Sequence, residues 1–419
     1  MNDLDERQPM AHQPSSMGPG RRGGPGRPGR RPGWSPDPPA RLVLVVGLIA
    51  AIGAILLLLN AGRPGPIAGV AIGGASANPS ASPARSSAAS SPASTPTFAV
   101  GASPAPSGTP SPSPQPVSAG PFAGYLMIAD HQNGRILIVD PAGRIHWQFP
   151  GSGSLSPGQH FSADDAFLSP DGKTIMANEE ERQVIVRIDI ATRRIIWQYG
   201  HFDVLGSSPG YLHTPDDAYP LANGDVIVAD IGNCRIVQIS PAKEIVHQWG
   251  RAGVCADHPP QTYGYPNGDT PLPDGGILIT EIRGSRIVRL DRLGTVIFDI
   301  HVPVSYPSDA QLDANGDILV VDYANPGAIL KVDHTGKVLW RYGPRSGPGR
   351  LDHPSLAITL PNGLIAVNDD FRERVVIIDP QTNRIVWQYG HTDRHGTAAG
   401  YLFTPDGIDL IPPDVAATL

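Results

Sequence analysis

A unit of four short apolar segments separated by turns recurs along this chain, and residues 213–250 show it in full. Within this unit, Asn223-Gly224 is a strong hairpin signal, because both positions accept positive φ. The β-branched runs 225–230 and 235–239 predict strands, as does the segment 244–249. Four antiparallel strands make one twisted sheet that cannot bury both faces alone. Stacked copies of the unit would supply the missing neighbours.

The third strand of the unit can be found six times, at a spacing of roughly 40 to 50 residues, which is the length of a propeller blade. The six copies are residues 135–140, 184–189, 235–240, 286–291, 328–333 and 375–379. The sequence therefore predicts an all-β fold, a six-bladed β-propeller with four-stranded antiparallel blades, over residues 121–419. The first copy starts with its second strand at Gly124, and residues 403–411 resemble the first strand 213–221. We therefore expect a C-terminal strand, 403–411, to complete the first blade and close the ring.

Two motifs within the repeats carry a resemblance to known families. The segment Val228 to Ile236, echoed by Ile128 to Ile136, resembles the NHL repeat. The blade ends Trp197-Gln-Tyr-Gly200 and Trp387-Gln-Tyr-Gly390 resemble those of quinoprotein-type (PQQ-like) propellers. The resemblance covers about residues 121–411 and implies the fold, whereas such propellers carry many functions. PQQ itself is not expected, because quinoprotein enzymes are typically eight-bladed with adjacent cysteines, and this sequence has six repeats and no Cys-Cys pair.

The first 120 residues differ in composition from the repeats. Residues 1–41 hold seven Arg against four acids and predict a disordered basic cytoplasmic tail. Leu42 to Leu59 is an uncharged apolar run of 18 residues, which predicts a transmembrane helix at 42–60 with its N-terminus in the cytoplasm. The alternative is a cleaved signal peptide, with Ala75-Ser-Ala77 as the cleavage site. Residues 61–120, rich in Ala, Ser and Pro, predict a disordered stalk.

The predicted propeller is acidic and would lie outside the cytoplasm as part of a single-pass cell-membrane protein. Residues 121–419 contain 23 basic and 35 acidic side chains. A net negative field of this size argues against nucleic-acid binding. Cys234 and Cys255 lie in loops on one face of the predicted fold, so an oxidising compartment favours a disulfide worth roughly 3 kcal/mol. The alternative is a pair of free thiols too far apart to bridge.

Candidate site residues gather at the start of each predicted first strand, on the face that carries the variable loops and long connections. We expect function on this face, because the opposite hairpin turns are short and uniform. The candidate ligand-binding residues are His213, Asp217, Asp165, His353, Asp216, Asp309, Arg135, Arg235 and Arg286. Asp165, Asp217, Asp269 and Asp309 would suit Ca²⁺, a hard ion that prefers oxygen ligands. Alternatively, these acids are solvated or cap the backbone, and the three arginines balance their charge.

Two connections repeat each other and leave a second question open. His201 and Asp203 correspond to His391 and Asp393 in matching segments. These four residues would form a paired ligand or metal site, or they would reflect only an internal duplication.

The sequence favours a membrane-anchored recognition or scaffold module for a cell-envelope protein or small ligand. The alternative is an enzyme of the lyase or sulfotransferase type, as some similar six-bladed propellers are, with its site at the channel mouth. A channel built from His and Arg around a metal would favour the enzyme. A solvated channel beside an exposed apolar patch would favour the binding protein. Whether the protein catalyses a reaction stays open at this point.

Overall fold

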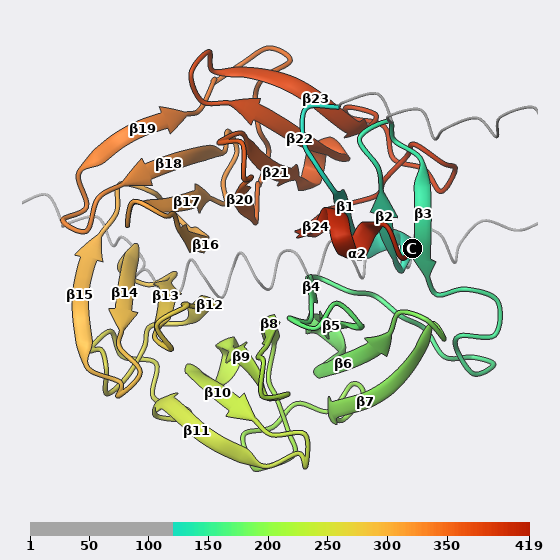
Figure 1. Cartoon of the computed structure of the whole chain (residues 1–419). Coiled ribbons are helices and arrows are strands. Elements are labelled where there is room, and N and C mark those ends of the chain that lie inside the picture. Colours follow the sequence, from blue (N-terminus) through green and yellow to red (C-terminus); the bar gives the residue numbers. More distant parts are fainter. Residues whose placement is uncertain (1–119) are drawn as a thin grey trace, which may run out of the picture. The chain divides into compact units, whose positions relative to one another are not determined.

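The computed structural model describes residues 120–419, which form a six-bladed β-propeller (Figure 1). Each blade is a four-stranded antiparallel sheet, as the repeats predict. We number the blades along the chain: blade 1 is β24-β1-β2-β3, and blades 2 to 6 begin with β4, β8, β12, β16 and β20. The predicted tail, the transmembrane helix 42–60 and the stalk up to residue 119 lie outside the described residues. Within residues 120–419, no helix is long and apolar enough to cross a membrane.

The strands of each blade run outward from the propeller axis in a fixed order. The innermost strands are β24 (Pro405–Ile411), β4 (Ala166–Leu168), β8 (Pro215–Pro220), β12 (Pro266–Pro271), β16 (Pro307–Leu312) and β20 (Ala357–Thr359). The second strands are β1 (Tyr125–Asp130), β5 (Thr174–Glu179), β9 (Val226–Asp230), β13 (Ile277–Glu281), β17 (Ile318–Asp322) and β21 (Ile365–Asp369). The third strands are β2 (Arg135–Val139), β6 (Val184–Asp189), β10 (Arg235–Ile239), β14 (Arg286–Leu290), β18 (Ala328–Val332) and β22 (Arg374–Asp379). The outer strands are β3 (Ile145–Phe149), β7 (Arg194–Gly200), β11 (Ile245–Gly250), β15 (Val296–His301), β19 (Val338–Tyr342) and β23 (Arg384–Gly390).

The hydrophobic core is divided into layers between neighbouring blades. One cluster joins blades 1 and 2, for example through Ile138 and Val186, and five equivalent clusters join the other pairs around the ring. The second and third strands are buried on both faces, which explains their runs of β-branched residues. Each sheet thus depends on both neighbours, as expected for a closed propeller.

The tryptophan of the blade-end motif fastens one blade to the next. Trp147 Nε1 donates to the carbonyl of Ile190 in blade 2 at 2.9 Å, and Trp197 Nε1 donates to the carbonyl of Pro241 in blade 3 at 2.9 Å. Trp387 Nε1 closes the circle by donating to the carbonyl of Pro141 in blade 1 at 2.8 Å. The repeated Trp therefore has a structural role, since it reaches the turn between the third and outer strands of the following blade.

The C-terminal strand closes the ring. β24 pairs with β1 in antiparallel register, with Leu126 opposite Leu410 and Ile128 opposite Ile408 (Figure 1). The backbone N–H of Phe403 also donates to Asp130 Oδ1 at 2.7 Å. Blade 1 is therefore built from both ends of the described chain. A short helix, α2 (Pro413–Ala416), follows β24.

Four of the second strands lead into a 3-10 turn on the connection face of the propeller. These turns are η1 (His131–Asn133), η2 (Glu180–Arg182), η3 (Ile231–Asn233) and η4 (Asp370–Arg372). The first residue of each turn follows directly on the last residue of a second strand. The side chains at these positions therefore stand at the same level around the axis, above the start of the innermost strands.

Candidate metal centre at the propeller axis

Six equivalent positions at the start of the innermost strands carry oxygen-bearing side chains. These positions are Asp164, Asp216, Asn267, Ser308, Ser355 and Asp406, one from each blade. Asn267 Nδ2 donates to Asp216 Oδ2 at 2.6 Å and to Ser308 Oγ at 3.3 Å. Ser355 Oγ donates to the carbonyl of Asp406 at 2.5 Å. Side chains from different blades therefore meet at the axis and form a polar ring.

A second level of acids lies one residue further along the innermost strands. Asp165, Asp217 and Asp309 occupy this position and are nearly fully buried. In blade 4 the position belongs to Gly268, because a Cβ there would lie 2.9 Å from Asp309 Oδ1. Blade 4 instead contributes Asp269 from the next position, and this side chain is also fully buried. The acids of both levels, together with Glu180 and Asp370 from the turns above, are called the axial acid cluster below.

The geometry brings metal-ligand atoms together at two points that share Asp164. His131, Asp164 and Asp406 offer one nitrogen and two carboxylate oxygens within 4.8 Å of one another. Asp164, Asp165 and Asp216 offer three carboxylate oxygens within the same distance. The second set contains only oxygen donors, which are the ligands that Ca²⁺ prefers. The neighbouring Asn267 presents its Nδ2 to Asp216, while its Oδ1 accepts from the hydroxyl of Tyr306.

Without a cation nearby, burial and mutual repulsion disfavour the charged form of the axial acids. Burial and the charges of Asp406 and Glu180 raise the pKa of Asp164 well above its usual value, and burial with the charges of Asp216 and Asp406 does the same to Asp165. Burial also raises the pKa of Asp216 to about 7. In the described chain, Asp269 finds no hydrogen-bond donor for either oxygen, and Asp217 and Asp370 each leave Oδ2 without one. A cation would compensate this charge and these unsatisfied atoms.

His131 is the one basic side chain of residues 120–419 that forms an ion pair with the cluster. Its Nδ1 lies 3.5 Å from Asp164 Oδ1, and its Nε2 lies 3.4 Å from Glu181 Oε1. Burial lowers the pKa of His131, but the hydrogen bond and charge of Glu181 and the charge of Asp406 outweigh burial and raise this pKa to about 9. A single imidazolium offsets little of the charge of nine neighbouring acids.

The arginines proposed from the sequence as counter-charges do not reach the axis, so that expectation is wrong. Arg135 Nε lies 2.6 Å from Asp130, and Arg235 Nε lies 2.7 Å from Asp230. Arg286 pairs with Asp257 at 3.0 Å and with Asp299 at 3.2 Å. The reason is their position: they begin the third strands, whereas the axial acids begin the innermost strands. They hold the connections in place, for example through Arg135 donating to the carbonyls of Thr397 and Tyr401.

The two candidate histidines lie outside the cluster. The imidazole of His213 packs over Gly232, where a Cβ would come within 2.5 Å of the ring, and its backbone N–H donates to Asp230. His353 Nδ1 lies 2.7 Å from Asp352 Oδ1, and its ring packs edge-on against Tyr323 and at a tilt against Phe371, at the rim of the mouth. His213 is thus a packing residue, and His353 borders the site without joining the donor sets.

The predicted metal ligands Asp165, Asp217, Asp269 and Asp309 all lie in the axial acid cluster, but only Asp165 belongs to a donor set. Burial and the charge of Asp309 raise the pKa of Asp217 well above its usual value. The predicted sets did not include Asp164, Asp406 and His131. Alignment of the blades by the end of each second strand would have found the first two. His131 follows that strand end and could have been found from the same register.

The duplicated connections have the same structure but do not form a joint site. Arg182 Nε contacts Asp203 at 3.2 Å, and Arg372 Nε contacts Asp393 at 3.0 Å. His201 stacks on Tyr211, and His391 stacks on Tyr401 in the same way. This pattern favours the internal-duplication interpretation. Cys234 and Cys255 form a disulfide with Cα atoms 5.1 Å apart.

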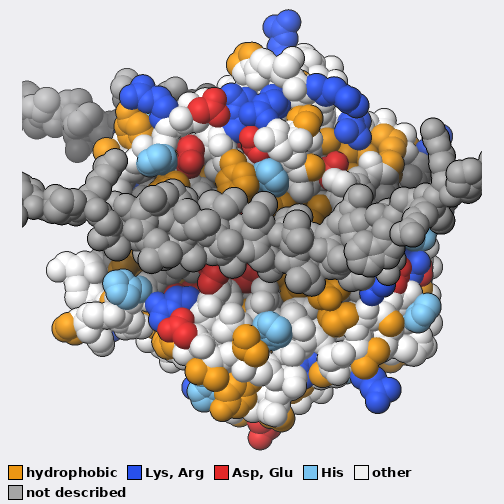
Figure 2. All heavy atoms as spheres, turned by 180° about the vertical axis from the view of Figure 1, so that it is seen from behind, with side chains coloured by type: hydrophobic (Ala, Val, Ile, Leu, Met, Phe, Trp, Pro, Cys, Tyr) orange, Lys and Arg blue, Asp and Glu red, His pale blue; other side chains and the backbone are white. Residues whose placement is uncertain are grey.

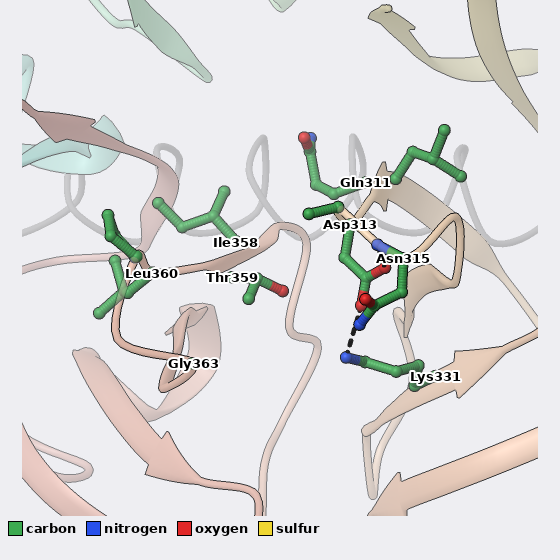
Figure 3. A pocket seen from close by; sticks show the side chains of 11 residues that line it. Gln311, Asp313, Asn315, Lys331, Ile358, Thr359, Leu360 and Gly363 are labelled. Atoms are coloured by element: carbon green, nitrogen blue, oxygen red, sulfur yellow. Dashed lines mark hydrogen bonds and ion pairs between the residues drawn. The ribbon is translucent and has the colours of Figure 1, made fainter.

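A pocket of about 520 Å³ lies on the hairpin face, where the sequence predicted only uniform turns. Figure 3 shows Ile358, Thr359 and Leu360 on one side, facing Gln311 and Asn315 on the other. Lys331 contacts Asp313 across 2.8 Å in its wall. The charged side chains of its lining, Lys331 and Asp313, are thus paired with each other, and the lining holds no cluster of acids. Seen from the side opposite to Figure 1, the propeller shows acidic side chains near the middle of the view and histidines spread around it (Figure 2).

Residues 181–404 match a PQQ-like family model described as outer membrane protein assembly factor BamB. The chain belongs to this family. Among solved structures, a protein of unknown function from Bacteroides caccae is similar with a TM-score of 0.50 and 15% identity, over 68% of this chain and 98% of that chain. Virginiamycin B lyase from Staphylococcus aureus aligns with a TM-score of 0.39 and 17% identity, over 54% and 68% of the two chains. No curated protein sequence matches the chain. The family match and the Bacteroides caccae structure support the PQQ-like propeller fold, while the NHL resemblance stays a sequence-based prediction.

Proposed function

We propose that this protein is a membrane-anchored, extracytoplasmic recognition module that holds Ca²⁺ at its axis and binds a cell-envelope ligand at the mouth on the connection face. The observation that carries the proposal is the convergence of nine acids from all six blades, seven of them buried, with only His131 as a cationic partner in the described chain. Among metals, an all-oxygen donor set favours Ca²⁺ over the softer transition metals.

The ion would serve the fold as well as the ligand. It would bind Asp164, Asp165 and Asp216. These residues come from blades 2 and 3, so one ion would link two blades whose acids otherwise repel one another at the axis. A Ca²⁺ coordination sphere of six to eight ligands leaves positions for water or for a ligand oxygen.

A binding role suits the mouth better than the lyase or sulfotransferase alternative. The arginines that an anion-processing site would need form ion pairs in the connections. The mouth does carry an exposed apolar side chain, Phe371, of which 45% is accessible. Attachment to the cell membrane rests on the apolar run 42–60 and is part of the same proposal.

Elemental analysis of the full-length protein tests the ion part of this function. We expect about one Ca²⁺ per chain after purification without chelator, and a loss of this metal in the Asp165→Asn/Asp216→Asn double variant. Leu293→Ala, an exposed residue of the hairpin face, is the matched control and should keep the metal. A parent protein that carries no metal and takes up none from millimolar CaCl₂ would rule the proposal out.

A further inference from the structure

Four aromatic side chains form an unbroken arc along one side of the mouth. Tyr306 and Tyr323 lie 5.3 Å apart between ring centres, Tyr323 and His353 lie 4.9 Å apart, and His353 and Phe371 lie 4.7 Å apart. They come from blades 5 and 6, opposite the acids of blades 1 to 3. We call these four residues the aromatic arc. The aromatic arc ends against the axial acid cluster, so aromatic rings lie next to carboxyl groups.

Both tyrosines are influenced by the charges of the acids. Burial raises the pKa of Tyr323, and the charges of Asp370 and Asp406 add to this effect. Burial likewise raises the pKa of Tyr306, with further contributions from Asp216 and Glu180. Tyr306 also donates a hydrogen bond of 2.9 Å to Asn267 Oδ1, and Asn267 Nδ2 in turn donates to Asp216 Oδ2. The arc and the acids therefore share one space.

Asp370 independently indicates a ligand site in this space. Its side chain is fully buried, and its Oδ2 has no hydrogen-bond donor within residues 120–419. Its other oxygen accepts from Asn368 Nδ2 at 2.7 Å, which fixes the orientation of the carboxylate. A buried oxygen without a donor costs free energy in the isolated protein, and a ligand that donates to it would recover this cost.

Phe371 is placed for a ligand and has no role in the core. It is exposed, whereas the corresponding residues of η1, η2 and η3 are Gln132, Glu181 and Gly232. Its neighbour His353 is held by Asp352, which also pairs with Arg350 at 3.2 Å, so positive charge at this rim is already matched. The rim therefore offers aromatic faces, while the floor behind it offers unpaired negative charge.

We propose that the mouth binds an alkylammonium group, with its charge against Asp370 and Asp406 and its methylene or methyl groups over Tyr323, His353 and Phe371. Carboxylates combined with aromatic faces are the chemistry that selects an organic cation over an anion or a neutral group. The inference rests on the proposed function only in placing the ligand at this mouth. With a divalent ion at Asp164, Asp165 and Asp216, the carboxyls of Glu180, Asp370 and Asp406 stay outside the donor set, and an ammonium group beside them would favour their charged forms.

Calorimetric titration with paired probes tests the charge requirement. The full-length protein, saturated with CaCl₂, is titrated with choline and with its uncharged isostere 3,3-dimethylbutan-1-ol. We expect choline to bind at least tenfold more tightly than the isostere. Equal binding of the two probes, or no binding of any ammonium at 50-fold excess, would overturn the proposal. A parallel titration with butylammonium shows whether a primary amine, as in a lysine side chain, or a quaternary amine, as in a lipid head group, fits better.

Two variants test the geometry. Phe371→Leu keeps an apolar side chain at an exposed position but removes the aromatic face, and we expect ammonium affinity to fall roughly two- to thirtyfold. Asp370→Asn keeps the shape and removes the charge, and we expect a loss of about tenfold or more. Leu293→Ala on the hairpin face should bind as the parent does. Unchanged affinity in Phe371→Leu and Asp370→Asn together would contradict the site.

The two proposals can fail separately. Repeating the choline titration in EDTA, and with the Asp165→Asn/Asp216→Asn variant, measures ammonium binding without the ion. Ammonium binding that survives while no Ca²⁺ binds would refute the ion site and support the mouth site. Ca²⁺ binding without any preference for choline over its isostere would refute the mouth site and support the ion site.

Discussion

At the scale of single residues, the unfavourable electrostatic interactions of this propeller are concentrated among the buried acids at the axis. Burial raises the pKa values of Asp165, Asp216, Asp217 and Asp309. The metal-free axis would therefore hold protons that ordinary aspartates have lost at neutral pH. Burial raises the pKa of Asp216 to about 7 and that of Asp309 to about 6. The axis should therefore respond to pH in the direction opposite to that of a salt-bridged protein.

The metal-free protein should become more stable as the pH falls from 8 to 5.5. The folded-state pKa values of Asp216 and Asp309 lie above the unfolded value, so in this range the native state holds more protons and its stability falls as pH rises. The raised pKa of His131, about 9, acts in the same direction. We expect the melting temperature in EDTA to be higher at pH 5.5 by on the order of 5 °C.

Saturating CaCl₂ should reduce or reverse this slope, because Ca²⁺ binds the deprotonated carboxylates. Thermal scans with and without the ion, at both pH values, measure the effect. A metal-free protein that is more stable at pH 8 than at pH 5.5 would contradict the assigned pKa shifts.

At the scale of elements, strand β24 joins the two ends of the described chain and also carries a site residue. It supplies the innermost strand of blade 1 and places Asp406 in the donor set with His131 and Asp164. Gly407 lies directly against Asp165, where a Cβ would collide with the carboxylate. Ring closure and assembly of the ion site are therefore coupled through the same seven residues.

Deleting residues 403–419 should remove both functions of this strand. The deletion exposes the edge of β1 and leaves Asp130 without the N–H of Phe403. We expect aggregation, or a melting temperature lower by at least 10 °C, together with loss of Ca²⁺ binding. Circular dichroism and light scattering on the truncated protein measure this. Melting at the parent's temperature would show that the ring is closed in some other way.

The elements could be predicted from the sequence because each blade repeats its own local signals. The Asn-Gly turn at 223–224, the run 226–230 and the Trp-x-Tyr-Gly ends all lie where the repeats put them. The register also leaves a place beside β1 for a C-terminal strand, and β24 lies there. The cysteine pair was open between a bridge and two thiols, because the distance depends on a connection whose path no repeat defines. It forms a disulfide.

The site could be predicted only in part, because its members come from different blades. The acids at the start of the innermost strands, such as Asp165 and Asp216, follow from the repeat register. The orientation of the Arg135 and Arg235 side chains does not follow from this register. The motif alone does not show that Arg135 pairs with Asp130 and Arg235 with Asp230, each within its own blade. The aromatic arc was missed for the same reason: Tyr306 and Phe371 are 65 residues apart and share no repeat position.

At the scale of the whole molecule, the two faces of the propeller differ in chemistry. The connection face holds the axial acid cluster and the aromatic arc, while the hairpin face holds short turns and a pocket whose charged residues are paired. The first described residues belong to the hairpin face, since Asn362 Nδ2 of a hairpin turn donates to the carbonyl of Pro121 at 2.6 Å. Attachment of the chain there would leave the mouth free.

The proposed topology predicts that the propeller can be reached from outside the cell. Protease added to intact cells should release a fragment that contains residues 121–419, because the Ala/Ser/Pro-rich segment before it offers cleavage sites. A reporter fused after Leu419 should be active only in a non-cytoplasmic compartment. Protection from protease, or a reporter active only in the cytoplasm, would contradict the topology.

Calorimetric titration of the metal-free, full-length protein with CaCl₂ tests the central claim, that the buried axial acids are built around a cation. We predict binding of about one Ca²⁺ per chain with release of protons, since Asp165 and Asp216 must lose theirs. The measured heat should therefore depend on the ionisation enthalpy of the buffer, and the Asp165→Asn/Asp216→Asn variant should show no binding. Absence of binding at millimolar CaCl₂ in the parent, or unchanged binding in the double variant, would contradict the account.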